Sequence, residues 1–328
     1  MLAAAVAVCS SLAASQSQAY FNNAQWSATA TDGSLSGTGA PITLTWGIAN
    51  DGTTVPNVLP GVNRSSDLIA SLDGWFGNGG GGPLTARPWF GFLESAFDAW
   101  GAVSGLTFIY EPNDDGAIHG NSPGLLGIRA DIRLAGGRYD GTVGTNFGTL
   151  AYSIAPDTAD IFFDTDDVSY YSNPVDDAFS LRHTLMHEIG HSLGLGHVTS
   201  NAADILLEPF FQTGFDGPQI DDIRGVQWLY GDPLEAGGGN DSIATATPLG
   251  ELSLGSQVVI GADGDETSVD LSMNDFISIH RSSDVDIYEL TVDEPTRVEV
   301  NLTPVGGSYD QRIGGGASTT VQATRVGN

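Results

Sequence analysis

Apolar residues along the first two thirds of the chain follow two different spacings, which predicts strands interleaved with helices. Short apolar or alternating runs predict four strands, at 42–49, 106–112, 130–136 and 159–165. Apolar residues at helical spacing predict helices at 66–76, 88–103, 176–195 and 220–231. We expect a serine cap to open the first of these helices and a proline to begin the second. Strands interleaved with a few helices are typical of an α+β domain.

The pattern changes after a glycine-rich segment at 232–240, which we interpret as a flexible linker. From residue 241 to 310 the apolar runs are short, lie between turn residues and show no helical spacing. This pattern predicts a small antiparallel β-sandwich. Residues 311–328 contain few bulky side chains, so we expect a disordered tail.

Residues 1–19 form an apolar stretch followed by small and polar residues, as in a secretory signal peptide cleaved near Ala19. The usual basic residues before the apolar stretch are missing. Cys9 offers an alternative as a lipoprotein anchor, but Val8 precedes it where a small residue is needed. Cleavage near Ala19 predicts a secreted, extracellular protein without cysteine and therefore without disulfides.

The formal net charge is −29, and the chain contains no lysine. A surface this acidic repels nucleic acid and anionic membranes, so we expect neither as a partner. Clustered carboxylates suit Ca²⁺, although an acidic surface also simply keeps a protein soluble. No segment after the first nineteen residues is long and apolar enough to span a bilayer.

The segment HEIGHSLGLGH, residues 187–197, carries the clearest chemistry. On a helix His187 and His191 share one face, so their imidazoles can hold one zinc ion. Gly194 permits a turn with positive φ, which can bring His197 to the same ion. Three protein ligands and an open position are typical of a catalytic zinc site. Glu188 follows the first ligand, where it can reach a water on the zinc without binding the metal itself.

Two further observations limit this interpretation. A bare H-E-x-x-H arises by chance in many proteins, but Gly194 and His197 at fixed offsets argue against coincidence. His183 lies one turn before His187, and a third ligand along the same straight helix would be too far from the metal. We therefore interpret His183 as a residue that packs the helix or supports the zinc ligands from behind.

The extended motif resembles the metzincin zinc peptidases, and the domain around it resembles their matrixin (matrix metalloproteinase-like) branch. The resemblance covers most of residues 41–231, including AFDAWGAVSGLTF, GTLAYSIAPDTADIFFDTDD and DDIRGVQWLYG. It implies a matrixin-like metallopeptidase domain over residues 20–231, with a twisted mixed sheet, an active-site helix and a C-terminal helix. It also implies that peptide substrates lie along the edge strand near 148–153.

The resemblance implies further metal sites, and the chain departs from the family at one of them. Tyr152 and Phe162 stand where the family's second, structural zinc uses histidines, so we expect that zinc to be absent. Asp140, Asp164 and Asp167 match carboxylate ligands of the family's calcium loop. The alternative for these aspartates is ordinary turn chemistry and solvated charge.

The resemblance also implies roles for residues around the zinc. Zinc would activate a water and polarise the scissile carbonyl, while Glu188 acts as general base. Leu207 stands where metzincins place a methionine in a tight turn beneath the zinc. Leu206, Phe210 and Phe211 are candidate walls of an apolar pocket for the residue after the cut.

The C-terminal region carries a weaker resemblance. NDSIATATPLG, followed by SSDVDIYELTV, is similar to the bacterial pre-peptidase C-terminal domain, a small β module of secreted peptidases. The later strands do not match, so the resemblance covers only part of such a module.

These observations together predict a secreted zinc endopeptidase that acts on extracellular proteins and also binds calcium. The alternative is a catalytically weak or inactive zinc-containing adhesion or binding module on a peptidase fold. Glu188 favours the enzyme, because a purely structural zinc site needs no base. Leu207 and the partial C-terminal module favour the alternative.

Overall fold

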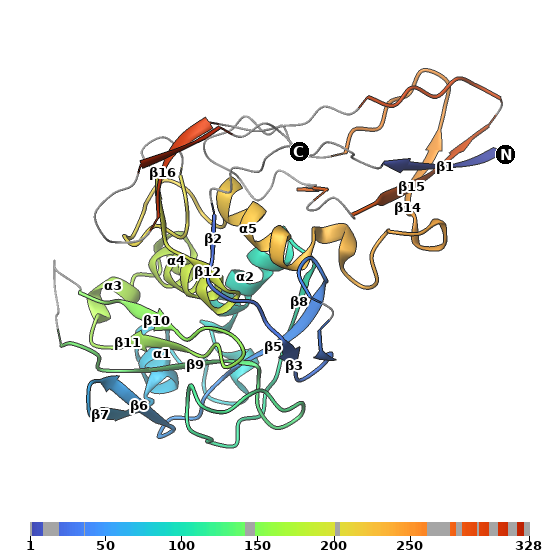
Figure 1. Ribbon diagram of the computed structural model, residues 1–328. Coiled ribbons are helices and arrows are strands. Elements are labelled where there is room, and N and C mark those ends of the chain that lie inside the picture. Colours follow the sequence, from blue (N-terminus) through green and yellow to red (C-terminus); the bar gives the residue numbers. More distant parts are fainter. Residues whose placement is uncertain are drawn as a thin grey trace.

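The centre of the protein is a five-stranded mixed sheet. The computed structural model describes residues 2–8, 20–35, 37–141, 148–200, 204–260, 276–279, 284–293, 295–301, 308–313 and 320–324. The strand order is β10-β11-β9-β5-β8 (Figure 1). These strands are β5 (Ile42–Ile48), β8 (Leu106–Tyr110), β9 (Ile132–Gly137), β10 (Ala151–Ser153) and β11 (Ile161–Asp164). Only β10 runs antiparallel to its neighbour, and it forms one edge. The predicted α+β fold with a mixed sheet is confirmed.

Two of the predicted helices pack on one face of this sheet. They are α2 (Phe90–Gly101) and α4 (Val175–Ser192). A third predicted helix, α5 (Ile220–Tyr230), lies on the side of these two that faces away from the sheet (Figure 1). Within α4, residues 176–178 have positive φ, so the regular helix begins at Phe179. The indole N–H of Trp100 on α2 donates to the carbonyl of Met186 on α4 at 2.9 Å. Trp46 on β5 stacks on Phe97 of α2 with ring centroids 4.6 Å apart, so sheet and helices share one core.

The start of α1 (Leu68–Phe76) differs from the sequence prediction. Its N-cap is Asp67 rather than a serine, and that side chain makes no capping hydrogen bond. Instead the Asp51 carboxylate accepts from the backbone N–H groups of Ile69 and Ala70, each at 3.0 Å. A carboxylate from a neighbouring turn thus satisfies the free donors of the first helical turn. Similarly, α2 begins at Phe90, just after the proline expected to open it.

Shorter elements complete the domain. A hairpin of β6 (Thr54–Leu59) and β7 (Val62–Ser65) packs Val55 and Val58 against Ala135 and Phe162 in a second, smaller core. The others are β2 (Phe21–Asn22), β3 (Ala28–Thr29), β4 (Gly33–Ser34), η1 (Leu84–Ala86), α3 (Val168–Tyr171), β12 (Leu195–Gly196) and β13 (Val198–Ser200). No helix in the described ranges combines the length and apolar character needed to cross a bilayer.

The C-terminal region differs from the antiparallel sandwich that the sequence predicts. After η2 (Pro233–Glu235) and η3 (Ile243–Thr245), strand β14 (Thr247–Leu252) pairs parallel with β15 (Asp286–Val292). The connection between them is long enough for the crossover that parallel pairing needs. Strand β1 (Leu2–Val8) pairs antiparallel on the other side of β15, inside the segment interpreted as a signal peptide. The predicted cleavage site near Ala19 lies outside the described residues.

Two more strands reach into the predicted disordered tail. They are β16 (Ser308–Ile313) and β17 (Thr320–Thr324), which pair antiparallel, and β16 also pairs with β13. Within the predicted linker 232–240, Asp232, Glu235 and Asn240 are buried.

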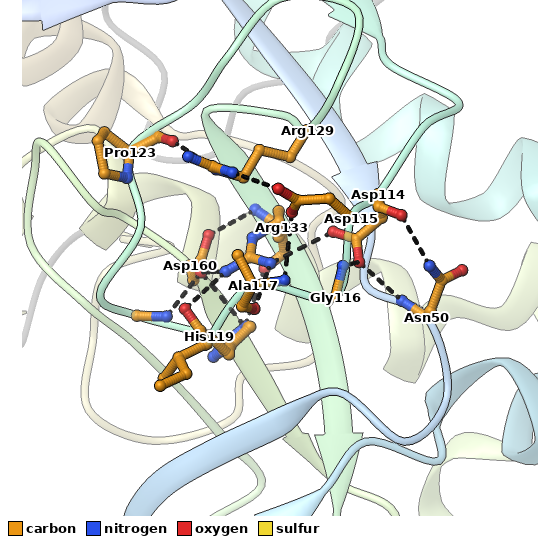
Figure 2. Close-up of polar contacts among 12 residues, drawn as sticks. Asn50, Asp114, Asp115, Gly116, Ala117, His119, Pro123, Arg129, Arg133 and Asp160 are labelled. Atoms are coloured by element: carbon orange, nitrogen blue, oxygen red, sulfur yellow. Dashed lines mark hydrogen bonds and ion pairs between the residues drawn. The ribbon is translucent and has the colours of Figure 1, made fainter.

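A buried ionic network fastens a long loop to the sheet (Figure 2). Arg133 on β9 is fully buried, and its guanidinium donates to Asp160 at 3.0 Å and Asp114 at 3.3 Å. The same group donates to the carbonyls of Ala117 and Ile118 at 2.9 and 3.0 Å. The backbone N–H of Arg133 donates to the other oxygen of Asp160 at 2.9 Å. One charged side chain therefore connects strand β9 with residues 114–118 and with Asp160.

We expect Arg133→Met to lower the free energy of unfolding by about 3–5 kcal/mol, because it leaves Asp160 buried without its counter-charge. The control is Arg129→Met, which removes a more exposed ion pair with Asp115 and should cost less than about 1 kcal/mol. Urea denaturation of both variants provides the measurement. An equal loss of unfolding free energy in the two variants would show that the buried Arg133 network stabilises the fold no more than the exposed ion pair does.

Candidate metal centre

Two of the predicted zinc ligands lie on one face of α4, and backbone carbonyls orient both. The Nδ1 of His187 lies 2.7 Å from the carbonyl oxygen of Leu206, and the Nδ1 of His191 lies 2.8 Å from that of Leu195. Because a carbonyl can only accept, each Nδ1 carries the proton. Each Nε2 therefore carries no proton and presents a lone pair. This is the tautomer in which a histidine can bind a metal through Nε2.

The third histidine reaches the same point after a sharp turn. Gly194 has a φ of +102°, and a Cβ there would lie 2.1 Å from the carbonyl oxygen of Ala24. Only glycine fits this conformation and this close approach. Beyond the turn β12 pairs with β2, and His197 follows directly. The prediction that Gly194 lets the chain turn back towards the helix is confirmed.

The three Nε2 atoms converge. The Nε2 of His187 lies 3.1 Å from the Nε2 atoms of both His191 and His197, and these two Nε2 atoms lie 3.0 Å apart. Nitrogens at this spacing can all contact one zinc ion at about 2.0–2.1 Å. Removal from water lowers the pKa of all three rings, to about 4 for His191 and well below the usual value for His187. Neutral imidazoles with facing lone pairs fit a cation, and the three histidines are of intermediate burial.

Glu188 lies beside this triad without belonging to it. The side chain is 6% exposed, and its Oε2 atom has no hydrogen-bond partner. Burial raises the pKa of Glu188 to about 8. A buried carboxyl group with a free oxygen next to a metal centre is equipped to exchange a proton.

A turn beneath the helix supports the site from below. Leu207 is buried there, and a Cβ added to Gly190 of α4 would lie 2.7 Å from its Cδ2 atom. The Asp222 carboxylate on α5 accepts from the backbone N–H groups of Leu206 at 2.7 Å and Leu207 at 3.2 Å. Since Leu206 in turn accepts from His187, Asp222 positions a zinc ligand through one peptide group. Sequence reasoning missed this role.

The other predicted site residues occupy different places. Leu206 is buried, whereas Phe210 is 71% exposed and Phe211 is 39% exposed. The ring of Phe211 contacts His183 with centroids 5.2 Å apart, and Phe215 contacts the same histidine at 5.3 Å. His183 is therefore packed among aromatic rings, in line with the sequence interpretation.

The aspartates matched to a calcium loop lie near one another around β11. The Asp164 carboxylate accepts from the backbone N–H groups of Tyr139 at 3.1 Å and Asp140 at 3.3 Å. Asp167 is buried, and neither of its carboxylate oxygens has a hydrogen-bond partner. Burial and the charges of Asp164 and Asp140 raise the pKa of Asp167 to about 7. Residues 142–147 of the same loop lie outside the described residues.

The positions matched to a second zinc hold two aromatic rings. Tyr152 on β10 stacks on Phe162 of β11 with centroids 5.3 Å apart. Neither side chain offers a nitrogen or a carboxylate. The absence of that zinc stays a prediction.

We expect Asp222→Ala to lower zinc affinity by about 10–100-fold, because the turn that orients His187 loses its anchor. Zinc affinity is measured by competition with a chromogenic chelator. The matched control is Glu94→Gln, an exposed carboxylate on α2, which should leave the affinity unchanged. Equal zinc affinity in wild type and Asp222→Ala would contradict the positioning role.

Comparison with known proteins places this site in a family. The matrixin family model matches residues 89–231. The hatching enzyme of Paracentrotus lividus is 32% identical over 145 residues, which cover 42% of this chain and 22% of that protein. Metalloendoproteinase 5-MMP of Arabidopsis thaliana is 33% identical over a stretch that covers 45% of this chain and 41% of that protein. Matrix metalloproteinase-16 of Homo sapiens is 33% identical over a stretch that covers 43% of this chain and 23% of that protein.

The match therefore spans less than half the length of each of these relatives. It includes α2, the sheet from β8 onwards, the histidine triad and α5. Residues 89–231 are a metallopeptidase domain of the matrixin family, and the histidine triad is its zinc site.

Proposed function

We propose that the protein is a secreted zinc endopeptidase that cleaves peptide bonds of extracellular proteins. The observation that carries this proposal is the convergence of three neutral imidazoles beside a buried carboxyl group, within a matrixin domain. Hydrolysis of casein or gelatin with and without a zinc chelator tests it. Unchanged hydrolysis after complete zinc removal would overturn it.

In this proposal His187, His191 and His197 hold the zinc ion. Bound zinc supplies Lewis acidity, which lowers the pKa of a water and polarises a carbonyl oxygen. Glu188 accepts the proton of the attacking water at its free Oε2 atom and returns it to the leaving amine. The carbonyls of Leu206 and Leu195 keep two imidazoles in the right tautomer throughout.

Strand β10 supplies the place where a substrate would lie. It is the last strand on its side of the sheet, and it packs next to α4. An extended peptide can pair with such an edge through backbone hydrogen bonds. Leu206 and Phe211 border the same helix and remain our candidates for pocket walls, whereas Phe210 contributes through its exposed ring.

We further propose that Asp140, Asp164 and Asp167 bind a structural calcium ion. The support is the buried and unpartnered Asp167 carboxylate beside two further acidic groups. We also propose that residues 1–19 are a signal peptide that is removed. Finally, we propose that residues 241–310 form a partial pre-peptidase-like module. The motifs around residues 240 and 284 support that module.

Glu188→Ala should leave zinc bound and lower peptide hydrolysis by about 10²–10⁴-fold, because the site loses its base but none of its ligands. Turnover of a fluorogenic peptide is measured together with zinc content. The companion variant His197→Ala removes a ligand and should instead lose zinc. One zinc per chain with undiminished turnover in Glu188→Ala would contradict this mechanism.

Leu207→Met separates the peptidase from the inactive-module alternative. Leucine and methionine have similar volumes, and such core exchanges usually cost less than about 1.5 kcal/mol. We therefore expect an active wild type and a change in turnover of less than about tenfold, measured at equal zinc loading. An inert wild type whose cleavage is restored by methionine would favour the degenerate module.

A further inference from the structure

A second group of potential metal ligands lies where the chain leaves the matrixin domain. Glu235 in η2, Asp241 and Asp284 place one carboxylate oxygen each within 4.8 Å of the others. Asp241 belongs to the NDS motif and Asp284 to the DVD motif, which the peptidase function does not use. The group therefore joins the end of the domain to the start of β15.

Most of this acidic group is removed from solvent. Glu235 and Asp284 are each 4% exposed, and the neighbouring Asp286 is 3% exposed. Only Asp241 is exposed. Burial of carboxylates is costly unless a counter-charge or hydrogen bonds compensate for the lost water.

Two neighbouring side chains have unused polar atoms. Asn240 is 1% exposed, and both its Oδ1 and its Nδ2 lack a hydrogen-bond partner. The Oδ1 of Asp286 also has none. The backbone carbonyl of Asn240 accepts from the N–H of Ile287 at 3.0 Å, which fixes Asn240 against the start of β15. The Asn240 amide lies close enough to Asp286 to lower its pKa, so it faces the acidic group.

Burial and nearby negative charges shift the pKa values of two carboxyl groups here upwards. Burial, together with the charges of Asp241 and Asp284, raises the pKa of Glu235 to about 8. Burial and the charges of Asp232 and Asp284 raise the pKa of Asp286 to about 7. Without a cation, these residues must hold protons near neutral pH.

The backbone keeps space beside the carboxylates. Gly239 has a φ of +70°, and a Cβ there would lie 2.7 Å from Oε2 of Glu235 and 3.8 Å from Oδ2 of Asp241. Asp232 has a different role, because its two oxygens accept from the backbone N–H groups of Leu234 at 2.8 Å and Ser278 at 2.7 Å. It shapes the loop from behind.

We propose that Glu235, Asp241 and Asp284 bind one calcium ion, with Asn240 Oδ1 and Asp286 as additional oxygen donors. All donors are oxygens and none is a thiolate or imidazole, which selects a hard cation. Several carboxylates from separate segments suit calcium better than magnesium, which requires a smaller and stricter octahedron. The ion clamps β15 to the end of the matrixin domain.

The experiment uses the full, zinc-loaded chain freed of calcium by dialysis. Calcium binding is measured by isothermal titration calorimetry and by the rise in melting temperature. The variants are Asp241→Asn, which changes an exposed residue and should not disturb folding, and Asp284→Asn. Each should weaken one calcium-binding event by at least about tenfold, because affinity follows the number of charged ligands.

Two controls assign that event to this site. Glu289→Gln alters an exposed carboxylate on the same strand β15 and should change calcium affinity less than about twofold. Asp167→Asn tests the other proposed calcium loop and should leave this event in place. Wild-type calcium binding in both Asp241→Asn and Asp284→Asn would overturn the proposal, as would equally tight binding of magnesium.

Discussion

The hydrogen bond from His187 to the carbonyl of Leu206 connects the metal centre to the rest of the domain. An imidazole can present Nε2 to a metal only if something holds its Nδ1 proton, and here that partner is a peptide group in a turn. The turn keeps its place because Asp222 on α5 binds two of its N–H groups. The position of one zinc ligand thus depends on a helix that begins 33 residues later in the chain.

Burial of negative charge is the second constraint on this chain, whose net charge is −29. The structure compensates buried carboxylates in different ways. Asp160 pairs with the guanidinium of Arg133 at 3.0 Å. Asp131 accepts from the backbone N–H groups of Ala30 at 2.8 Å and Thr45 at 2.9 Å. Asp167 and Asp286 retain unpartnered oxygens, and these are the places where our calcium proposals lie.

Much of the fold and the zinc site followed from the sequence because local pattern and function coincide there. The strands and helices of the matrixin domain have strong periodicity, and the histidine spacing fixes which side chains share a face. The misses are long-range. Asp51 replaces the expected cap of α1, and nothing near residue 66 indicates it. The buried pairing of Arg133 with Asp160 is another long-range contact that the sequence did not predict. The C-terminal strands pair across long connections, which periodicity cannot assign.

Several residues at the C-terminal boundary of the matrixin domain are buried, although the composition of this segment indicates an exposed linker. Glycines at 237–239 predict a flexible connection, yet Glu235 before them and Asn240 after them are buried. The side-chain amide of Gln227 on α5 also donates to the carbonyls of Val103 and Phe276, at 2.9 and 2.6 Å. One helix therefore holds the core of the domain and a segment beyond the family match. Asp222 on that helix also binds the turn beneath the zinc ligands. The same helix therefore contacts both the turn that orients His187 and a segment beyond the family match.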